Sequence, residues 1–227
     1  YDPNHQLLVK TQNTLETASP KYIALIAAAD GKYLIELEAK EPGPKVVRYR
    51  LITSQPHTAT DADRHYALAQ QMSDEAEKLF ETATAESRRL AMAKFQASLP
   101  EWRAAKERGR EAETLHSVAT LKKMLGDNRE ALTVEQEALA LARAVNDRQL
   151  ETDALNGLGT IYSALSQFPQ AMETWRQALR LCRELGDCET EVSLLNNLGA
   201  VSSTLGSSQQ SLEYYLEALS LARQLGL

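Results

Sequence analysis

The side chains that most often carry out chemistry are scattered along this chain of 227 residues. The histidines stand far apart, at His5, His57, His65 and His116. No HExxH, GxSxG or glycine-rich phosphate loop accompanies them. Cys182 and Cys188 lie in no CxxC motif, which favours two free thiols over a disulfide or a zinc site. The sequence therefore predicts no catalytic residue, no metal and no cofactor.

Composition and charge exclude several classes of partner. The chain is 43% apolar and 25% charged, which is typical of a folded globular protein. Residues 59–227 hold 18 Lys and Arg against 25 Asp and Glu, whereas binding to nucleic acid requires clustered basic residues. The longest apolar run, 22–29, is too short for a membrane span, and no signal peptide is visible. We expect a cytoplasmic location, and because the chain begins with Tyr1, we expect a piece of a longer protein.

An internal repeat dominates the second half of the chain. Residues 153–187 and 193–227 align without a gap and are identical at 14 of 35 positions. Apolar and small residues recur at steps of three and four, as in Leu155, Leu158 and Tyr162, which predicts one helical face. Residues 166–168 leave room only for a tight turn before a second helix. Each copy is therefore predicted to be a helical hairpin, and the same frame holds one period earlier.

The helix ends and the small residues fit this prediction. Asn146, Gly186 and Gly226 follow the expected second helices, where a left-handed cap is favourable. Arginines stand in the preceding turns, where they suit the negative end of the helix dipole. Small residues recur every forty positions, which predicts close helix contacts at Ala119, Gly159 and Gly199, and at Ala138, Ala178 and Ala218.

These residues resemble the tetratricopeptide repeat, whose pattern is matched by Leu155, Leu158-Gly159, Tyr162, Ala171, Trp175 and Ala178. The resemblance implies a mainly α fold, a tetratricopeptide solenoid that forms a right-handed superhelix of helical hairpins. Glu135 departs from the pattern because an aromatic residue is expected there, and Lys122 and Ser202 replace the equivalent of Tyr162. We expect the repeats over 59–227, with units 111–150, 151–190 and 191–227 after an atypical unit 59–110.

The atypical unit has its own signals. Thr60 with Asp63 three residues later predicts an N-terminal cap for its first helix. The stretch 81–89 predicts a longer connection than those of the later units. Pro100 should kink or split the second helix, with Trp102 packed near the kink.

Residues 1–58 have a different pattern. The stretches 32–39 and 45–52 alternate apolar and polar residues around a turn at 41–44, which predicts strands of a small antiparallel β segment before the solenoid. This segment resembles the last half of a pre-peptidase C-terminal-like β-sandwich, a partial sandwich here. The order of the two parts is similar to that of bacterial proteins that continue into a caspase-like CHAT protease domain. The resemblance implies that any activity lies outside this chain.

The repeat resemblance also implies where a ligand would bind. The first helices of a tetratricopeptide superhelix line its concave groove, and their groove positions correspond to Glu113, His116, Thr120, Lys123, Asp153, Asn156, Thr160, Ser163, Ser193, Asn196, Asn197, Ala200 and Ser203. Asn156 and Asn196 could form a ladder of amides that holds an extended peptide by its backbone. Each could equally bond to a neighbouring helix or to water. His116 is either a structural polar residue or a pH sensor.

Two function classes remain open from the sequence. The first is a non-catalytic scaffold that binds a protein or peptide in the groove, with neither nucleic acid nor membrane as a partner. The alternative is self-assembly, a homodimer formed through the apolar C-terminal face that includes Leu212 and Leu216. Carbohydrate binding by the β segment is a further alternative, which rests on the sandwich resemblance alone.

Overall fold

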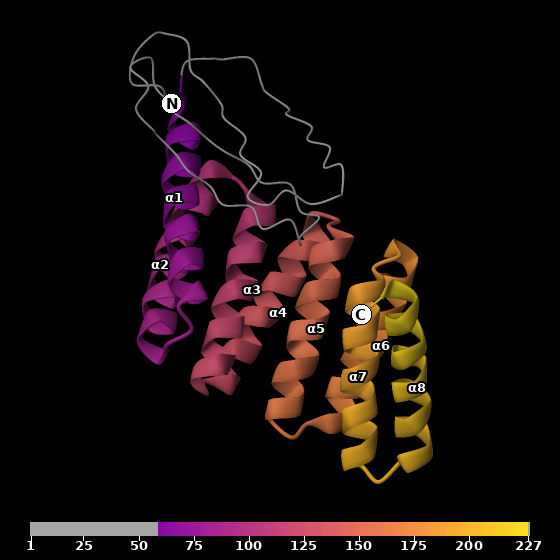
Figure 1. Ribbon diagram of the computed structural model, residues 1–227. Coiled ribbons are helices and arrows are strands. Elements are labelled where there is room, and N and C mark those ends of the chain that lie inside the picture. The colour runs from indigo at the N-terminus through magenta and orange to yellow at the C-terminus, as the bar shows by residue number, and fades with distance from the viewer. Residues whose placement is uncertain (1–58, 227) are drawn as a thin grey trace.

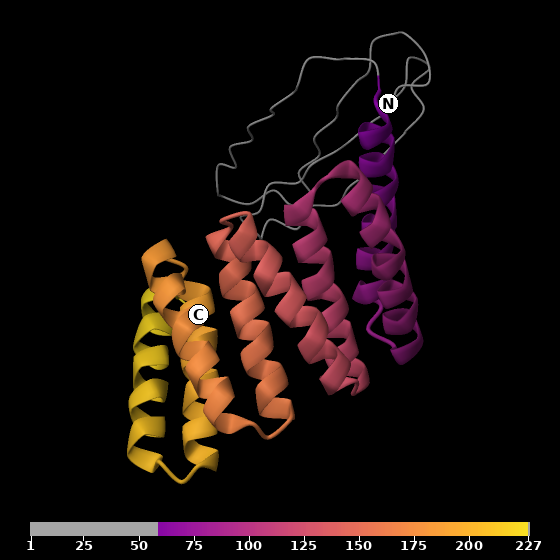
Figure 2. The ribbon, with the colours of Figure 1, turned by 180° about the vertical axis from the view of Figure 1, so that it is seen from behind.

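The computed structural model describes residues 59–226, and the predicted β segment at 1–58 lies outside the described residues. Within this range the chain forms eight helices. They are α1 (Asp61–Glu81), α2 (Ala85–Ala105), α3 (Arg108–Leu125), α4 (Asn128–Ala144), α5 (Arg148–Ala164), α6 (Phe168–Leu185), α7 (Cys188–Thr204) and α8 (Ser208–Leu225). Consecutive pairs form antiparallel hairpins that follow one another in chain order from α1 to α8 (Figures 1 and 2).

Local signals in the sequence account for the helix ends. Thr60 and Asp63 form a capping box at the start of α1, which confirms the predicted cap. Asn146, Gly186 and Gly226 have φ values of 56°, 71° and 77°, so the predicted left-handed conformations after the second helices are confirmed. Helices α4, α6 and α8 are therefore each followed within two residues by a residue with positive φ.

One expectation for the first hairpin is wrong, and the split that Pro100 could have caused in the second helix does not occur. The connection between α1 and α2 spans only residues 82–84, because the capping box of Thr84 and Ser87 starts α2 early. Pro100 lies inside α2 and does not split it. Pro100 is exposed, so the carbonyl that loses its donor can be hydrated by solvent. Trp102 is buried, and its ring meets Tyr66 edge to face, with centroids 5.1 Å apart.

The core lies between the helices of each hairpin and between successive hairpins. Its largest cluster joins α5, α6 and α7 through residues such as Leu158, Trp175 and Leu195. Ala138, Ala178 and Ala218 are all buried, as the repeat predicts for points of close approach. No described helix is both long and apolar enough to cross a membrane.

The array has an inner and an outer side. We call α1, α3, α5 and α7 the first helices and α2, α4, α6 and α8 the second helices. Beyond its contacts with adjacent elements, α3 contacts α5, and α5 contacts α7, whereas no comparable contact joins two described second helices. A row of hairpins whose first helices lie closer together must curve toward them. The first helices α3, α5 and α7 therefore line the inner side.

Candidate functional site

The predicted groove residues lie on the first helices α3, α5 and α7. Within α5, for example, Asp153, Asn156 and Thr160 are partly exposed, whereas the intervening Leu155 and Leu158 are buried in the core. None of the thirteen predicted positions is buried. These positions therefore form one row of exposed or partly exposed residues along the first helices, polar except for Ala200, which we call the inner row.

Several side chains of the inner row have no partner. Among residues 59–226, no hydrogen bond or ion pair engages the side chains of Thr120, Lys123, Ser163, Asn196 and Ser203. Other members are engaged locally. Glu113 accepts a bond from Arg110 at 2.7 Å, and Thr160 donates to the carbonyl of Gly157 at 2.8 Å. The inner row therefore carries unengaged donors and acceptors, and the ammonium group of Lys123 has no ion pair among the described residues.

The two asparagines that the sequence singled out differ in their surroundings. Asn156 is partly buried, and its Oδ1 accepts hydrogen bonds from Trp175 Nε1 at 3.1 Å and from Asn197 Nδ2 at 3.5 Å. Asn156 is therefore engaged with a neighbouring helix and with the next unit. Asn196 is exposed, and its amide is free to bind a ligand backbone.

His116, at the position of Asn156 in the preceding unit, belongs to a buried ionisable pair. Its Nδ1 lies 2.6 Å from Oε1 of Glu135, whose side chain is fully buried between α3, α4 and α5. The other carboxylate oxygen of Glu135 has no hydrogen-bond partner among the described residues. The sequence marked Glu135 only as a departure from the repeat and did not predict this pair.

The pair replaces an asparagine and an aromatic residue. The next unit places Asn156 against Trp175 at the positions of His116 and Glu135, so both members change together in one unit. A comparison of the repeat columns could have revealed this coupled change. The chemistry at these positions therefore differs between units. The hairpin of α3 and α4 carries an ionisable pair, whereas the hairpin of α5 and α6 carries a neutral asparagine and tryptophan.

The glycines at positions 159 and 199 lie against aromatic side chains of the second helices. A Cβ on Gly159 would lie 2.5 Å from Cδ1 of Trp175, and a Cβ on Gly199 would lie 2.9 Å from Cε1 of Tyr215. The equivalent position in the earlier unit is Ala119, and the position equivalent to Trp175 and Tyr215 in that unit is Glu135. Glycine at positions 159 and 199 thus leaves room for an aromatic ring of the second helix, whereas the unit that carries Ala119 has Glu135 in place of that ring.

Burial and neighbouring charges shift the pKa values of three side chains, His116, Glu135 and Asp153, which we call the ionisable cluster. Burial lowers the pKa of His116, but the hydrogen bond and the negative charge of Glu135 outweigh it, so that the pKa is raised. Burial raises the pKa of Glu135, and His116 offsets this only in part. The pKa of Asp153 is also raised by burial. All three pKa values are therefore higher than those of the same side chains in water, so the ionisable cluster holds its protons to higher pH.

An arginine near the end of each of the second helices α2, α4 and α6 joins successive hairpins. Arg183 Nε donates to Glu191 in α7 at 2.7 Å, and its Nη2 donates to Glu217 in α8 at 2.5 Å. Arg143 Nε likewise donates to Glu151 at 2.8 Å. Arg103 contacts Glu111 and Glu137 in the same arrangement. We call this series the arginine ladder, in which each arginine binds the hairpin that follows its own.

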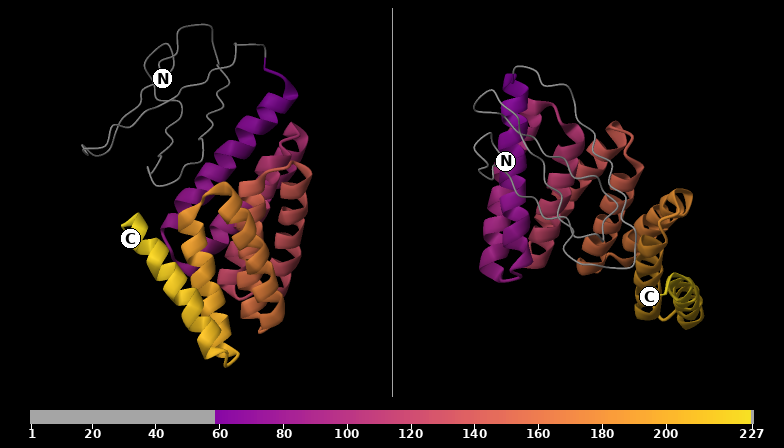
Figure 3. Two further views of the ribbon diagram at one scale, coloured as in Figure 1. Left: turned by 90° about the vertical axis from the view of Figure 1, so that its right-hand side faces the viewer. Right: turned by 45° about the horizontal axis from the view of Figure 1, so that its top comes forward.

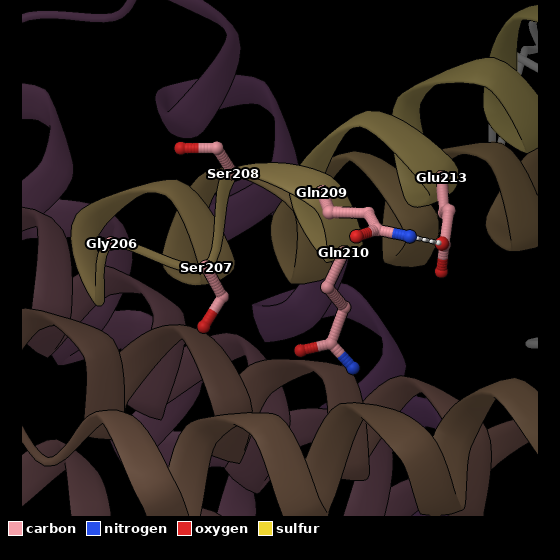
Figure 4. A pocket seen from close by; sticks show the side chains of 6 residues that line it. All are labelled: Gly206, Ser207, Ser208, Gln209, Gln210 and Glu213. Carbon is pink, nitrogen blue, oxygen red and sulfur yellow. Dashed lines mark hydrogen bonds between the residues drawn. The ribbon is translucent and has the colours of Figure 1, made fainter.

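The cysteines and one shallow surface depression are the remaining candidates for a reactive site among the described residues. Both cysteines are free, and burial raises the pKa of the Cys182 thiol to about 12. The depression, about 480 Å³, is formed by one turn and the start of α8 and is lined by Gly206, Ser207, Ser208, Gln209, Gln210 and Glu213 (Figure 4). In residues 59–226 no three His, Cys, Asp or Glu side chains gather to hold a metal ion.

Several solved structures are similar in fold to this chain. The chain resembles the apo form of RapI (16% identity, TM-score 0.65, covering 70% of this chain and 57% of that one). It also resembles a Rap protein complexed with competence and sporulation factor. Here the identity is 15%, the TM-score is 0.61, and the similarity covers 72% of this chain and 44% of that one. A third similar structure is a putative kinesin light chain from Podosopora anserina with TPR-like repeats. Its identity is 12%, its TM-score is 0.55, and the similarity covers 72% of this chain and 77% of that one.

The chain spans about half the length of the two Rap structures. No curated protein sequence matches it. Residues 150–224, which include most of α5 to α8, match a family model described as tetratricopeptide repeat. The described part of the chain thus has the fold of tetratricopeptide-like helical repeat proteins, and its last two hairpins match the tetratricopeptide repeat family.

Proposed function

We propose that this chain is a non-catalytic scaffold that binds an extended peptide or a partner surface along the inner row, as the docking or sensing part of a larger bacterial regulatory protein. The observation that carries the proposal is the set of free polar side chains on the inner side, Thr120, Lys123, Ser163, Asn196 and Ser203. Polar groups at regular spacing suit a ligand whose own backbone repeats. The fold similarity to a Rap protein that was solved as a complex also supports a binding role.

A blocking experiment tests this proposal. Short peptides are selected from a displayed random library against the whole chain, and their affinities are compared among variants. We expect Ser163→Arg and Asn196→Arg to weaken binding by at least about tenfold, because a long side chain fills the inner side.

The matched controls are Ala140→Arg and Ser220→Arg, at exposed positions on second helices where the intervening unit already carries Arg180. We expect these variants to bind as the parent does. Weakened binding in the controls together with unchanged binding in the inner-row variants would place the ligand on the outer side and contradict the proposal.

Self-association through the C-terminal face is the second candidate function. It is favoured by the exposure of Leu212 and Leu216 in α8, which are 58% and 55% exposed. Light scattering over a concentration series tests it. The candidate predicts that the chain associates and that the double variant Leu212→Glu/Leu216→Glu is a folded monomer. A parent that stays monomeric throughout the series contradicts it.

A further inference from the structure

His116 keeps one ring nitrogen in the core and presents the other to the inner side. Its Nδ1 lies 2.6 Å from Oε1 of Glu135, whose side chain is fully buried. Its Nε2 has no hydrogen-bond partner among residues 59–226 and is not buried, and 29% of the side chain of His116 is exposed. The imidazole therefore connects a buried carboxyl group to the surface of the inner row, where α3, α4 and α5 lie side by side in the middle of the array (Figure 3, right).

The equivalent position in the next unit shows what such a group offers to a ligand. Trp175 Nε1 can only donate a hydrogen bond, so the amide atom of Asn156 that it meets at 3.1 Å must be Oδ1. Nδ2 of Asn156 has no partner among the described residues and is not buried. Asn156 thus offers the inner side an N–H donor that is held from behind by the second helix and that does not titrate.

The hydrogen-bonding role of His116 Nε2 depends on how many protons His116 and Glu135 hold together. Because Nδ1 and Oε1 are only 2.6 Å apart, a proton must lie between them, on either atom. If the pair holds a second proton, Nε2 carries it in both arrangements and is a donor. If the pair holds only the bridging proton, Nε2 has a lone pair and is an acceptor. Position 116 therefore gains or loses its donor with one proton and without a change in geometry.

We propose that His116 is a proton-gated donor of the inner row, which binds a backbone carbonyl oxygen of the peptide ligand while the pair holds two protons. When Nε2 gives its proton to solvent, that hydrogen bond is lost. The proposal rests on the proposed function, since it requires a peptide along the inner row. Asn156 supplies the equivalent bond one unit further along at every pH, so the gate changes the affinity of the inner row and does not abolish binding.

The charged groups around His116 favour a neutral acceptor. Besides Glu135 of α4, the charges of Asp153 in α5 and Lys123 in α3 act on His116, and Asp153 has the larger effect of these two. Arg103 of α2, the third helix that packs on α3, is bound within the arginine ladder. The negative charge of Asp153 disfavours a carboxylate ligand at Nε2, so a carbonyl oxygen fits better.

The direction of the gate follows from the titration of the pair. Burial lowers the pKa of His116, but the hydrogen bond and the charge of Glu135 raise it above the ordinary 6.5. The two-proton state therefore persists above pH 6.5 and is lost as the pH rises further, so binding should weaken toward alkaline pH.

The test measures the affinity of an inner-row peptide at pH 6 and pH 9. The peptide comes from the displayed library, is acetylated at its N-terminus and contains no His, Cys or Tyr, so it does not titrate in this range. We expect the parent to bind it at least about tenfold more weakly at pH 9, as for the loss of one hydrogen bond from a charged donor. The variant His116→Asn/Glu135→Gln, whose amides do not titrate, should bind equally at both pH values.

Two further measurements assign the effect. Lys123→Gln should keep the pH dependence of the parent, and nitrogen NMR of the ligand-free chain should show Nε2 of His116 protonated at pH 6 and unprotonated at pH 9. An Nε2 that stays protonated at pH 9, or pH dependence that disappears in Lys123→Gln, would overturn the proposal.

The outcome also separates this proposal from the proposed function. A peptide that Ser163→Arg weakens, but whose affinity for the parent is the same at both pH values, overturns the gate and leaves inner-row binding intact. A peptide whose affinity neither Ser163→Arg nor Asn196→Arg changes lies elsewhere and overturns both.

Discussion

Replacing His116 with alanine is expected to lower the free energy of unfolding by about 3 kcal/mol, the cost of removing one partner of a buried ion pair. Glu135 is fully buried and has His116 as its hydrogen-bond partner at 2.6 Å, so the variant leaves its carboxyl group without a partner. Urea unfolding measures the loss. The matched control is Asn196→Ala, at the exposed equivalent position, which should change stability by no more than about 0.5 kcal/mol.

A second variant distinguishes loss of the pair from loss of packing. His116→Ala/Glu135→Leu leaves no buried charge, so it should recover most of the stability that His116→Ala loses. An equal loss in the double variant would show that the charge of Glu135 is irrelevant.

The same pair has a defined pH dependence. A raised pKa of His116 in the folded state means that its stabilisation is complete below the ordinary pKa of 6.5 and is lost as the pH rises through the folded-state pKa. The raised pKa of Glu135 acts in the same direction, because folding favours its protonated form. The parent should therefore exceed His116→Asn/Glu135→Gln in stability by more at pH 6 than at pH 8. A constant difference would contradict this assignment.

Replacing Gly159 with alanine is expected to destabilise the chain by about 2 kcal/mol, which is typical of overpacking in a buried site. The new Cβ would lie 2.5 Å from Cδ1 of Trp175, a side chain that is only 2% exposed and cannot move away. This cost exceeds the gain of about 1 kcal/mol in helix propensity from glycine to alanine. Thermal and urea unfolding measure the net effect.

The control for this prediction is another helical glycine. Gly109 in α3 has nothing within 4 Å of the position of an added Cβ, so Gly109→Ala should be neutral or stabilising by up to about 1 kcal/mol. If the two substitutions had the same effect, close approach of Trp175 would not be the reason for glycine at position 159.

The sequence predicts the helices well because their determinants are local. The forty-residue period, the cap at Thr60 and the positive-φ residue Gly186 each act within a few residues of the chain, and the structure confirms these features. For Pro100 the local rule leaves a kink or a split open, and the structure shows that α2 runs on through the exposed proline without a split.

The chemistry between helices was harder to predict. Glu135 looks like a lost aromatic residue until it is compared with position 116, nineteen residues away on another helix. The arginines were explained by the helix dipole, whereas the structure gives Arg183 two glutamate partners in the next hairpin. Both features depend on contacts between hairpins, which a one-dimensional pattern reveals only when whole repeat columns are compared.

The most direct test of the proposed binding role is a hydrogen-exchange footprint of the whole chain with a selected peptide. The account predicts slowed exchange along the inner row, strongest around Ser163 and Asn196, with no change on the outer surface of α4 and α6. Slowed exchange confined to the second helices, or to residues 1–58, would contradict the claim that the inner side of the array is the binding surface.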